Sequence, residues 1–140
     1  MNFLIRHNHV KKAARQYRKE LKNKIDLYNV TEYLKTKGHT VVFFNTPSGD
    51  EKIIAFDLKT EAETLKAFTC CEQNEISFVC VDNNLHNTDK LYLLLHETAH
   101  ILLKHIGDSR SEYLNQYLAE IEAEAFVYDV LIHSNAYCMH

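Results

Sequence analysis

The residue types best suited to chemistry are two histidines four positions apart, in the sequence His96-Glu97-Thr98-Ala99-His100. On a helix, positions i and i+4 lie on the same face, so both imidazoles can reach one metal ion. Histidine nitrogens bind Zn²⁺ at about 2.0–2.1 Å. Glu97 projects about a quarter of a turn away, where its carboxylate can act as a general base on water. The pattern therefore predicts a zinc site with hydrolytic chemistry.

The surrounding residues have the composition of a buried helix, expected over residues 88–106. Asn87, Thr88 or Asp89 can cap its start, and Gly107 can end it. Leucines and alanine occupy most of its circumference, which is typical of a buried helix. The alternative is that the histidines are ordinary polar residues on an exposed stripe. Because burying two imidazoles and a carboxylate is costly without pairing or a metal, we favour the metal interpretation.

A catalytic zinc site needs a third protein ligand, with its fourth position left for water. A long helical pattern follows Gly107 and is expected over residues 109–134. It begins with Ser109 and Glu112 at the spacing of a capping box. The third ligand is therefore expected among the acidic residues of this second helix.

Three glutamates alternate along this helix, a pattern that usually marks a solvated acidic face. On a helical wheel, however, Glu120 and Glu124 share a stripe with apolar residues, whereas Glu122 falls on another side and is expected to face solvent. We predict that Glu120 completes the metal site with His96 and His100. Glu124, one turn later, is expected to orient a ligand imidazole as a hydrogen-bond acceptor.

Three segments in this order resemble the ImmA/IrrE family of metallopeptidases. In that family a strand ends in an Asn- or Asp-rich turn, an HExxH helix follows, and a later helix has a pattern close to E-x-E-A-N-x-F-A-x-x-L-L. The corresponding segments here are I-S-F-V-C-V-D-N-N-L-H, L-H-E-T-A-H-I-L-L-K-H and E-I-E-A-E-A-F-V-Y-D-V-L. Matching Ala123 and Phe126 to the family's Ala and Phe places its metal-ligand glutamate on Glu120.

The chain departs from the family pattern at three places. Ala99 replaces the usual glycine before the second histidine, and Glu124 replaces the usual asparagine. Leu-Ile-His-Ser, at residues 131–134, stands where many members have Leu-Met-Pro. The last difference bears on substrate recognition more than on the metal site.

The resemblance implies a zincin-like core with the HExxH motif on a buried helix, Zn²⁺ as cofactor, and a narrow regulatory task. That task would be cleavage of a helix-turn-helix repressor, as in phage or mobile-element induction or a stress response. The alternative is a proteolytically inactive metal-binding protein that docks on a transcriptional regulator. Glu97 argues against this alternative, because a purely structural site closes its fourth position and needs no general base. A further hypothesis is a metal-free helical protein with an accidental motif.

Length and composition predict one domain over residues 1–140. The first ten residues are too polar for a signal peptide, and no apolar run approaches the ~20 residues needed to span a bilayer. The four cysteines show neither CxxC pairs nor the spacing of a disulfide scaffold. We therefore expect a cytoplasmic protein with reduced thiols.

Charge is unevenly distributed along the chain. Residues 1–38 carry ten Lys/Arg against three Asp/Glu, a net charge of +7, whereas residues 39–140 carry six against sixteen, a net charge of −10. We expect a basic helical section at 1–38, packed on the domain through the apolar stripe Val10, Ala14, Tyr17, Leu21 and Ile25. The alternative is a face for an acidic partner or nucleic acid. Because no DNA-reading motif is present, specific nucleic-acid binding is not predicted, and a repressor substrate would be a separate protein.

A small antiparallel or mixed sheet is expected over residues 39–82, which gives an α+β fold with helices packed on the sheet. A short helix, Val30–Thr36, precedes it and ends at Gly38. The expected strands are Thr40–Asn45, Ile53–Asp57, Ala67–Cys71 and Ile76–Asp82. Turn signals separate the strands, and the clearest is Pro47-Ser48-Gly49-Asp50.

Overall fold

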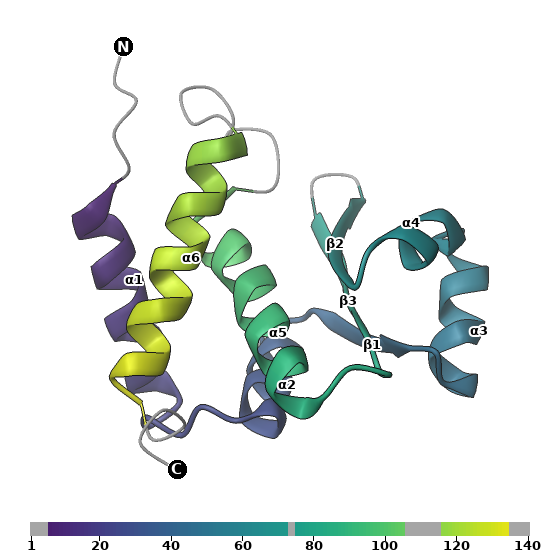
Figure 1. Cartoon of the computed structure of the whole chain (residues 1–140), viewed down its shortest axis with the longest axis horizontal. Coiled ribbons are helices and arrows are strands. Elements are labelled where there is room, and N and C mark those ends of the chain that lie inside the picture. The colour runs from purple at the N-terminus through teal and green to yellow at the C-terminus, as the bar shows by residue number, and fades with distance from the viewer. Residues whose placement is uncertain (1–5, 73–74, 106–115, 135–140) are drawn as a thin grey trace.

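A computed structural model of the chain describes residues 6–72, 75–105 and 116–134, with only the backbone described at 71–72 and 75–77. The fold is α+β, as the sequence predicts (Figure 1). Its elements, in chain order, are α1 (His7–Glu20), α2 (Leu27–Thr36), β1 (Thr40–Phe44), α3 (Pro47–Ala55), α4 (Lys59–Thr64), β2 (Ala67–Glu72), β3 (Glu75–Asp82), α5 (Asn87–Leu102) and α6 (Gln116–Ile132).

The sheet is mixed, with strand order β1-β3-β2. β3 pairs in parallel with β1 and antiparallel with β2. Val79 lies opposite Val41 on one side and opposite Thr69 on the other. Because side chains alternate between the two faces of a sheet, these three residues share one face.

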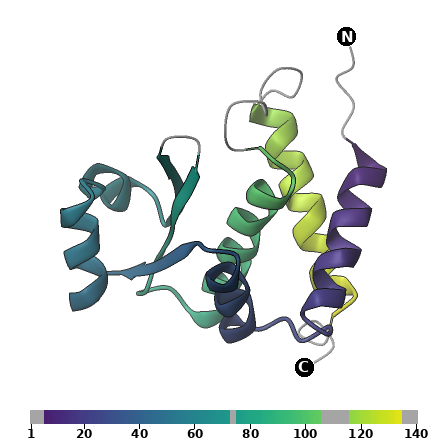
Figure 2. The ribbon, with the colours of Figure 1, turned by 180° about the vertical axis from the view of Figure 1, so that it is seen from behind.

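Each face of the sheet has its own hydrophobic core. Val41, Val79 and Val81 pack against buried residues of α1, α2, α5 and α6. The other face packs on α3 and α4 through Val42, Phe44, Ile53, Leu58, Phe68, Phe78 and Cys80. Figure 2 shows the same separation from behind, with α3 and α4 on one side of the strands and the remaining helices on the other.

The segment between β1 and β2 is helical and contains no strand, so the expected strand Ile53–Asp57 is wrong. Thr46 caps α3 by accepting a hydrogen bond from the Gly49 N–H at 3.0 Å, and Pro47 occupies the first turn. These turn-forming residues are equally suited to a helix start. Gly49 is required here, because a Cβ at this position would lie 2.0 Å from the Phe43 carbonyl oxygen.

The basic N-terminal section packs on the domain, as its apolar stripe predicts. Val10, Ala14 and Tyr17 of α1 are buried, and α1 lies along α6. The Tyr17 ring lies 5.6 Å from the Phe126 ring on α6. Two arginines strengthen this contact, since Arg18 of α1 pairs with Asp129 at 3.2 Å and Arg6 pairs with α6 from just before α1.

Two elements differ in extent from the expectation. α5 begins at Asn87 with His86 as its N-cap residue, not with Asn87, Thr88 or Asp89 in that role, and it ends before Gly107. α6 is described from Gln116, and the expected capping box at Ser109 and Glu112 lies outside the described residues. Within the described residues, no helix combines the length and apolar content needed to cross a membrane.

Candidate metal centre

The turn after β3 fixes how α5 leaves the sheet. The Asp82 carboxylate accepts hydrogen bonds from the Asn84 N–H at 2.9 Å and from the Asn45 side chain at 2.8 Å. Lys90, in the first turn of α5, donates to the Asn83 side chain at 2.9 Å. The Asn- and Asp-rich turn therefore anchors the start of the helix to the end of the sheet.

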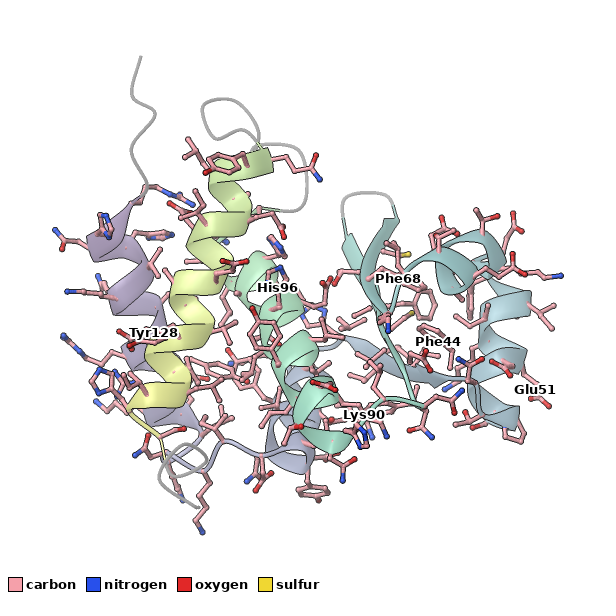
Figure 3. The ribbon with its side chains drawn as sticks, in the orientation of Figure 1. Phe44, Glu51, Phe68, Lys90, His96 and Tyr128 are labelled. Atoms are coloured by element: carbon pink, nitrogen blue, oxygen red, sulfur yellow. The ribbon has the colours of Figure 1, made fainter. Side chains whose placement is uncertain are left out.

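α5 buries one side and presents its two histidines on another. Leu94, Leu95 and Ala99 are fully buried in the core between sheet and helices. The side chains of His96 and His100 remain 13% and 11% exposed. Figure 3 shows His96 on α5, between α6 and the strands.

The three residues predicted as metal ligands come together in space. The Nε2 atoms of His96 and His100 are 3.2 Å apart. Glu120, on α6, places one carboxylate oxygen 3.0 Å from His96 Nε2 and the other 2.7 Å from His100 Nε2. Each of the three side chains offers one atom that could bind a metal, and these atoms lie within 4.8 Å of one another. Within the described residues, they form the group of His, Cys, Asp and Glu side chains that could hold a metal ion.

The chemistry of this donor set fits a zinc ion. Two histidines and one glutamate are a known ligand set of catalytic zinc sites, which leaves a fourth position open. Burial lowers the pKa of His100 below its ordinary value, although Glu120 opposes the shift. The imidazole is therefore neutral at pH 7 and can offer a lone pair to a metal.

Glu97, between the two histidines in the sequence, is partly buried and accepts a hydrogen bond from the sheet. Thr69 of β2 donates a hydrogen bond to Glu97 Oε1 at 2.7 Å. This contact follows from the strand register, because Thr69 lies on the sheet face that packs against α5. Burial raises the pKa of Glu97, and the Thr69 hydrogen bond and His96 only partly oppose the shift. A carboxylate with a raised pKa is better matched to proton transfer near neutral pH.

Glu122 was expected to face solvent, and this expectation is wrong. Its side chain is fully buried and accepts three hydrogen bonds from Arg6: from the backbone N–H at 2.7 Å, from Nε at 3.0 Å and from Nη2 at 2.7 Å. Burial by itself raises the pKa of Glu122, but the hydrogen bonds from Arg6 and His105 together lower it to about 2. The helical wheel failed here because α6 is covered by α5 on one side and by α1 on another.

The inward orientation expected for Glu120 and Glu124 is also wrong, because both side chains are exposed; Glu120 nevertheless reaches both histidines from its exposed position. Nδ1 of His100, the ring nitrogen that faces away from Glu120, lies 2.9 Å from Nδ1 of His105. His105 in turn places Nε2 2.8 Å from the Glu122 carboxylate. The position of His105 follows from the way α5 ends.

α5 ends in a Schellman motif, in which the helix closes through a residue in the left-handed conformation. Lys104 takes this conformation with φ 60°. Its N–H donates to the Ile101 carbonyl at 3.2 Å, and the His105 N–H donates to the His100 carbonyl at 2.8 Å. The motif folds His105 back onto His100, and sequence reasoning missed this because it looked for a glycine at the helix end. The spacing of five residues between the two histidines was the available signal.

A model of the IrrE N-terminal-like domain, a peptidase family, matches residues 37–139, which is more than half of the chain. The matched region contains β1 through α6 and therefore His96, Glu97, His100 and Glu120. No significant match to a curated protein or to a solved structure was found. From the family match, this chain belongs to the ImmA/IrrE family of metallopeptidases.

Proposed function

We propose that this chain is a zinc-dependent endopeptidase, with His96, His100 and Glu120 as metal ligands and Glu97 as general base. The observation that carries the proposal is the convergence of three ligand atoms on α5 and α6. Beside them lies a partly buried carboxylate that a threonine holds in place. Membership of a metallopeptidase family supports the same chemistry.

The residues present divide the work of peptide hydrolysis. When bound, zinc would supply Lewis acidity, which polarises a peptide carbonyl and makes water more acidic. Because Thr69 holds Glu97 Oε1, the other carboxylate oxygen is oriented to take a proton from the attacking water. The same oxygen then delivers that proton to the leaving amine. The raised pKa of Glu97 favours both transfers near neutral pH.

We further propose a protein substrate that binds in an extended conformation along β2. This strand is at the edge of the sheet, and its residue Thr69 contacts Glu97. Backbone pairing with such an edge would bring the substrate chain beside the general base. Following the family resemblance, we propose that the substrate is a separate helix-turn-helix repressor in the cytoplasm, cut at a specific site as a regulatory step.

The first test measures zinc content and cleavage on the same samples. Wild type should hold about one zinc per chain, and Glu120→Ala and His100→Ala should lose it. Glu97→Gln keeps the acceptor for Thr69, so it should hold zinc yet cleave at least about 100-fold more slowly. Glu51→Gln, on the far side of the sheet in Figure 3, is the control for an exposed glutamate.

The substrate probe is a set of purified helix-turn-helix repressors from the source genome, with fragments identified by mass spectrometry. Zinc-dependent fragments that Glu97→Gln does not produce would support the proposal. A wild type that holds zinc and binds a repressor without cutting it would overturn the peptidase and favour the inactive docking protein. A wild type that holds no zinc, even after reconstitution, would overturn both.

A further inference from the structure

A continuous line of hydrogen bonds leads from His100 away from the metal centre. It runs from His100 Nδ1 to His105 Nδ1 at 2.9 Å, and from His105 Nε2 to Glu122 at 2.8 Å. Arg6 holds the outer end with a backbone N–H and two guanidinium atoms. His105 is 5% exposed and Glu122 is fully buried, so the line lies inside the protein.

With a neutral His105, each hydrogen bond in this line runs in one direction only. The ionised Glu122 carboxylate has no proton to give, so His105 Nε2 must donate to it. A neutral imidazole carries one N–H, which leaves His105 Nδ1 as an acceptor. His100 Nδ1 must therefore be the donor to His105. The proton of His100 is then on Nδ1, and its lone pair is on Nε2, the atom that faces Glu120 and His96.

We propose that His105 and Glu122, anchored by Arg6, are positioning residues that fix the tautomer and ring orientation of His100 for metal binding. This inference rests on the proposed metal site. It deepens that proposal by assigning a task to residues that are not themselves proposed as metal ligands. Hydrogen bonds of this kind typically change metal affinity by about 10–100-fold when they are removed.

The two ligand histidines differ in this respect. His96 Nδ1 is buried without a hydrogen-bond partner in the described part of the chain, whereas His100 Nδ1 has His105. Of the two histidines, His105 therefore orients His100 and not His96. The outer end of the line is Arg6, which precedes the region that the family model matches. Arg6, which lies outside the matched region, thus fixes Glu122 and through it His105, the hydrogen-bond partner of His100.

The test is the zinc dissociation constant of the full chain, measured by competition with a chelator. His105→Phe keeps an aromatic ring and removes both hydrogen bonds, so zinc affinity should fall about 10–100-fold. His105→Gln can accept from His100 through its carbonyl and donate to Glu122 through its amide, so affinity should stay within about fivefold of wild type. His7→Phe, at an exposed histidine on α1, is the matched control.

Thermal unfolding of each metal-free variant separates loss of the fold from loss of positioning. If folded His105→Phe and His105→Gln both bind zinc as tightly as wild type, the inference is wrong. Equal weakening in both folded variants also overturns it, because packing alone would then explain the loss. If wild type binds no zinc, the proposed metal site is wrong as well. The failure of the proposed function can therefore be told apart from the failure of this inference alone.

A spectroscopic measurement on zinc-loaded wild type keeps the inference testable even if His105→Phe does not fold. In ¹⁵N-labelled protein, an N–H···N hydrogen bond transmits a scalar coupling between the two nitrogens. We expect this coupling between His100 Nδ1 and His105 Nδ1, together with a proton on His105 Nε2. A proton on His105 Nδ1, or absence of the coupling, would overturn the assignment.

Discussion

Glu97 and Thr69 show how much depends on one hydroxyl group. The Thr69 hydrogen bond orients one carboxylate oxygen of Glu97 and stabilises its charged form. The sequence predicts Glu97 because the HExxH spacing places it beside the two histidines. It does not predict Thr69, because that contact depends on which face of β2 packs against α5.

Thr69→Val removes the hydroxyl and keeps the shape of the side chain. Because hydrogen bonds to charged groups contribute about 1.5–3 kcal/mol, we expect kcat to fall by roughly 10–100-fold with zinc content unchanged. The same hydrogen bond lowers the pKa of Glu97, so its loss should move the acidic limb of the pH–rate profile to higher pH. Steady-state kinetics across pH check this, with exposed Thr60→Val as control. An unchanged kcat and profile would contradict it.

The candidate ligand residues are the part of the site that the sequence predicts best. His96 and His100 lie on one helix, where a fixed spacing determines their geometry. Glu120 was chosen from the helical wheel and the family pattern, and the packing of α6 on α5 brings it to both histidines. Glu122 was expected to face solvent and is buried, whereas Glu120 and Glu124 were expected to face inward and are exposed. A helical wheel divides a helix into inside and outside, but α6 contacts two helices and has two buried sides.

Among the elements, the strands of the sheet were predicted well. β1, β2 and β3 match three of the four expected strands within a few residues. The fourth, Ile53–Asp57, is largely in α3, where Ile53 is buried and Ile54 is 73% exposed. A short apolar run cannot distinguish a helix that packs one face from a strand.

The end of α5 offers an element-scale prediction, because Lys104 has a positive φ that side chains disfavour. Lys104→Gly should relieve this strain and raise the free energy of unfolding by up to about 1 kcal/mol. Zinc affinity should stay unchanged, since the motif and His105 are retained. Lys104→Val should be destabilising, because a β-branched residue tolerates this conformation poorly.

Urea denaturation of the metal-free proteins measures the effect of both substitutions at Lys104. Exposed Lys12→Gly on α1 is not a matched control, because it adds glycine inside a helix. Exposed Lys37→Gly, at the C-cap residue of α2, is closer in its position on the helix, although it also removes the Glu20 ion pair and the contact with the Tyr33 ring. If Lys104→Gly lowers stability, the left-handed conformation is not a source of strain.

For the whole molecule, α1 and the domain are joined by charge as well as by apolar packing. Arg6 and Arg18 pair with Glu122 and Asp129, so part of the basic N-terminal section neutralises α6. The uneven charge of the sequence indicated a basic helix. It could not indicate that the acidic partner lies in the same chain, because that pairing depends on tertiary structure.

The lowered pKa of Glu122 predicts how the metal-free protein responds to acid. Against the effect of burial, hydrogen bonds from Arg6 and His105 lower the pKa of Glu122 from an ordinary value of about 4.5 to about 2, so its contribution to stability is present above pH 4.5 and is lost as pH falls towards 2. Between these pH values, the difference in the free energy of unfolding between wild type and Glu122→Gln should therefore shrink by up to about 3 kcal/mol. Denaturant unfolding at a series of pH values checks this, with Glu51→Gln as control. A pH-independent difference would contradict it.

The Arg6–Glu122 pair joins two segments that leave the ribosome at different times. The partners are separated by 116 positions, so α1 leaves the ribosome long before the helix it binds. At roughly 5–20 residues per second, the interval is on the order of 6–23 s. Glu120 emerges at the end of the same interval. A nascent chain therefore presents His96, Glu97 and His100 before Glu120 and Glu122 have been made, and the complete candidate site forms only after α6 has emerged.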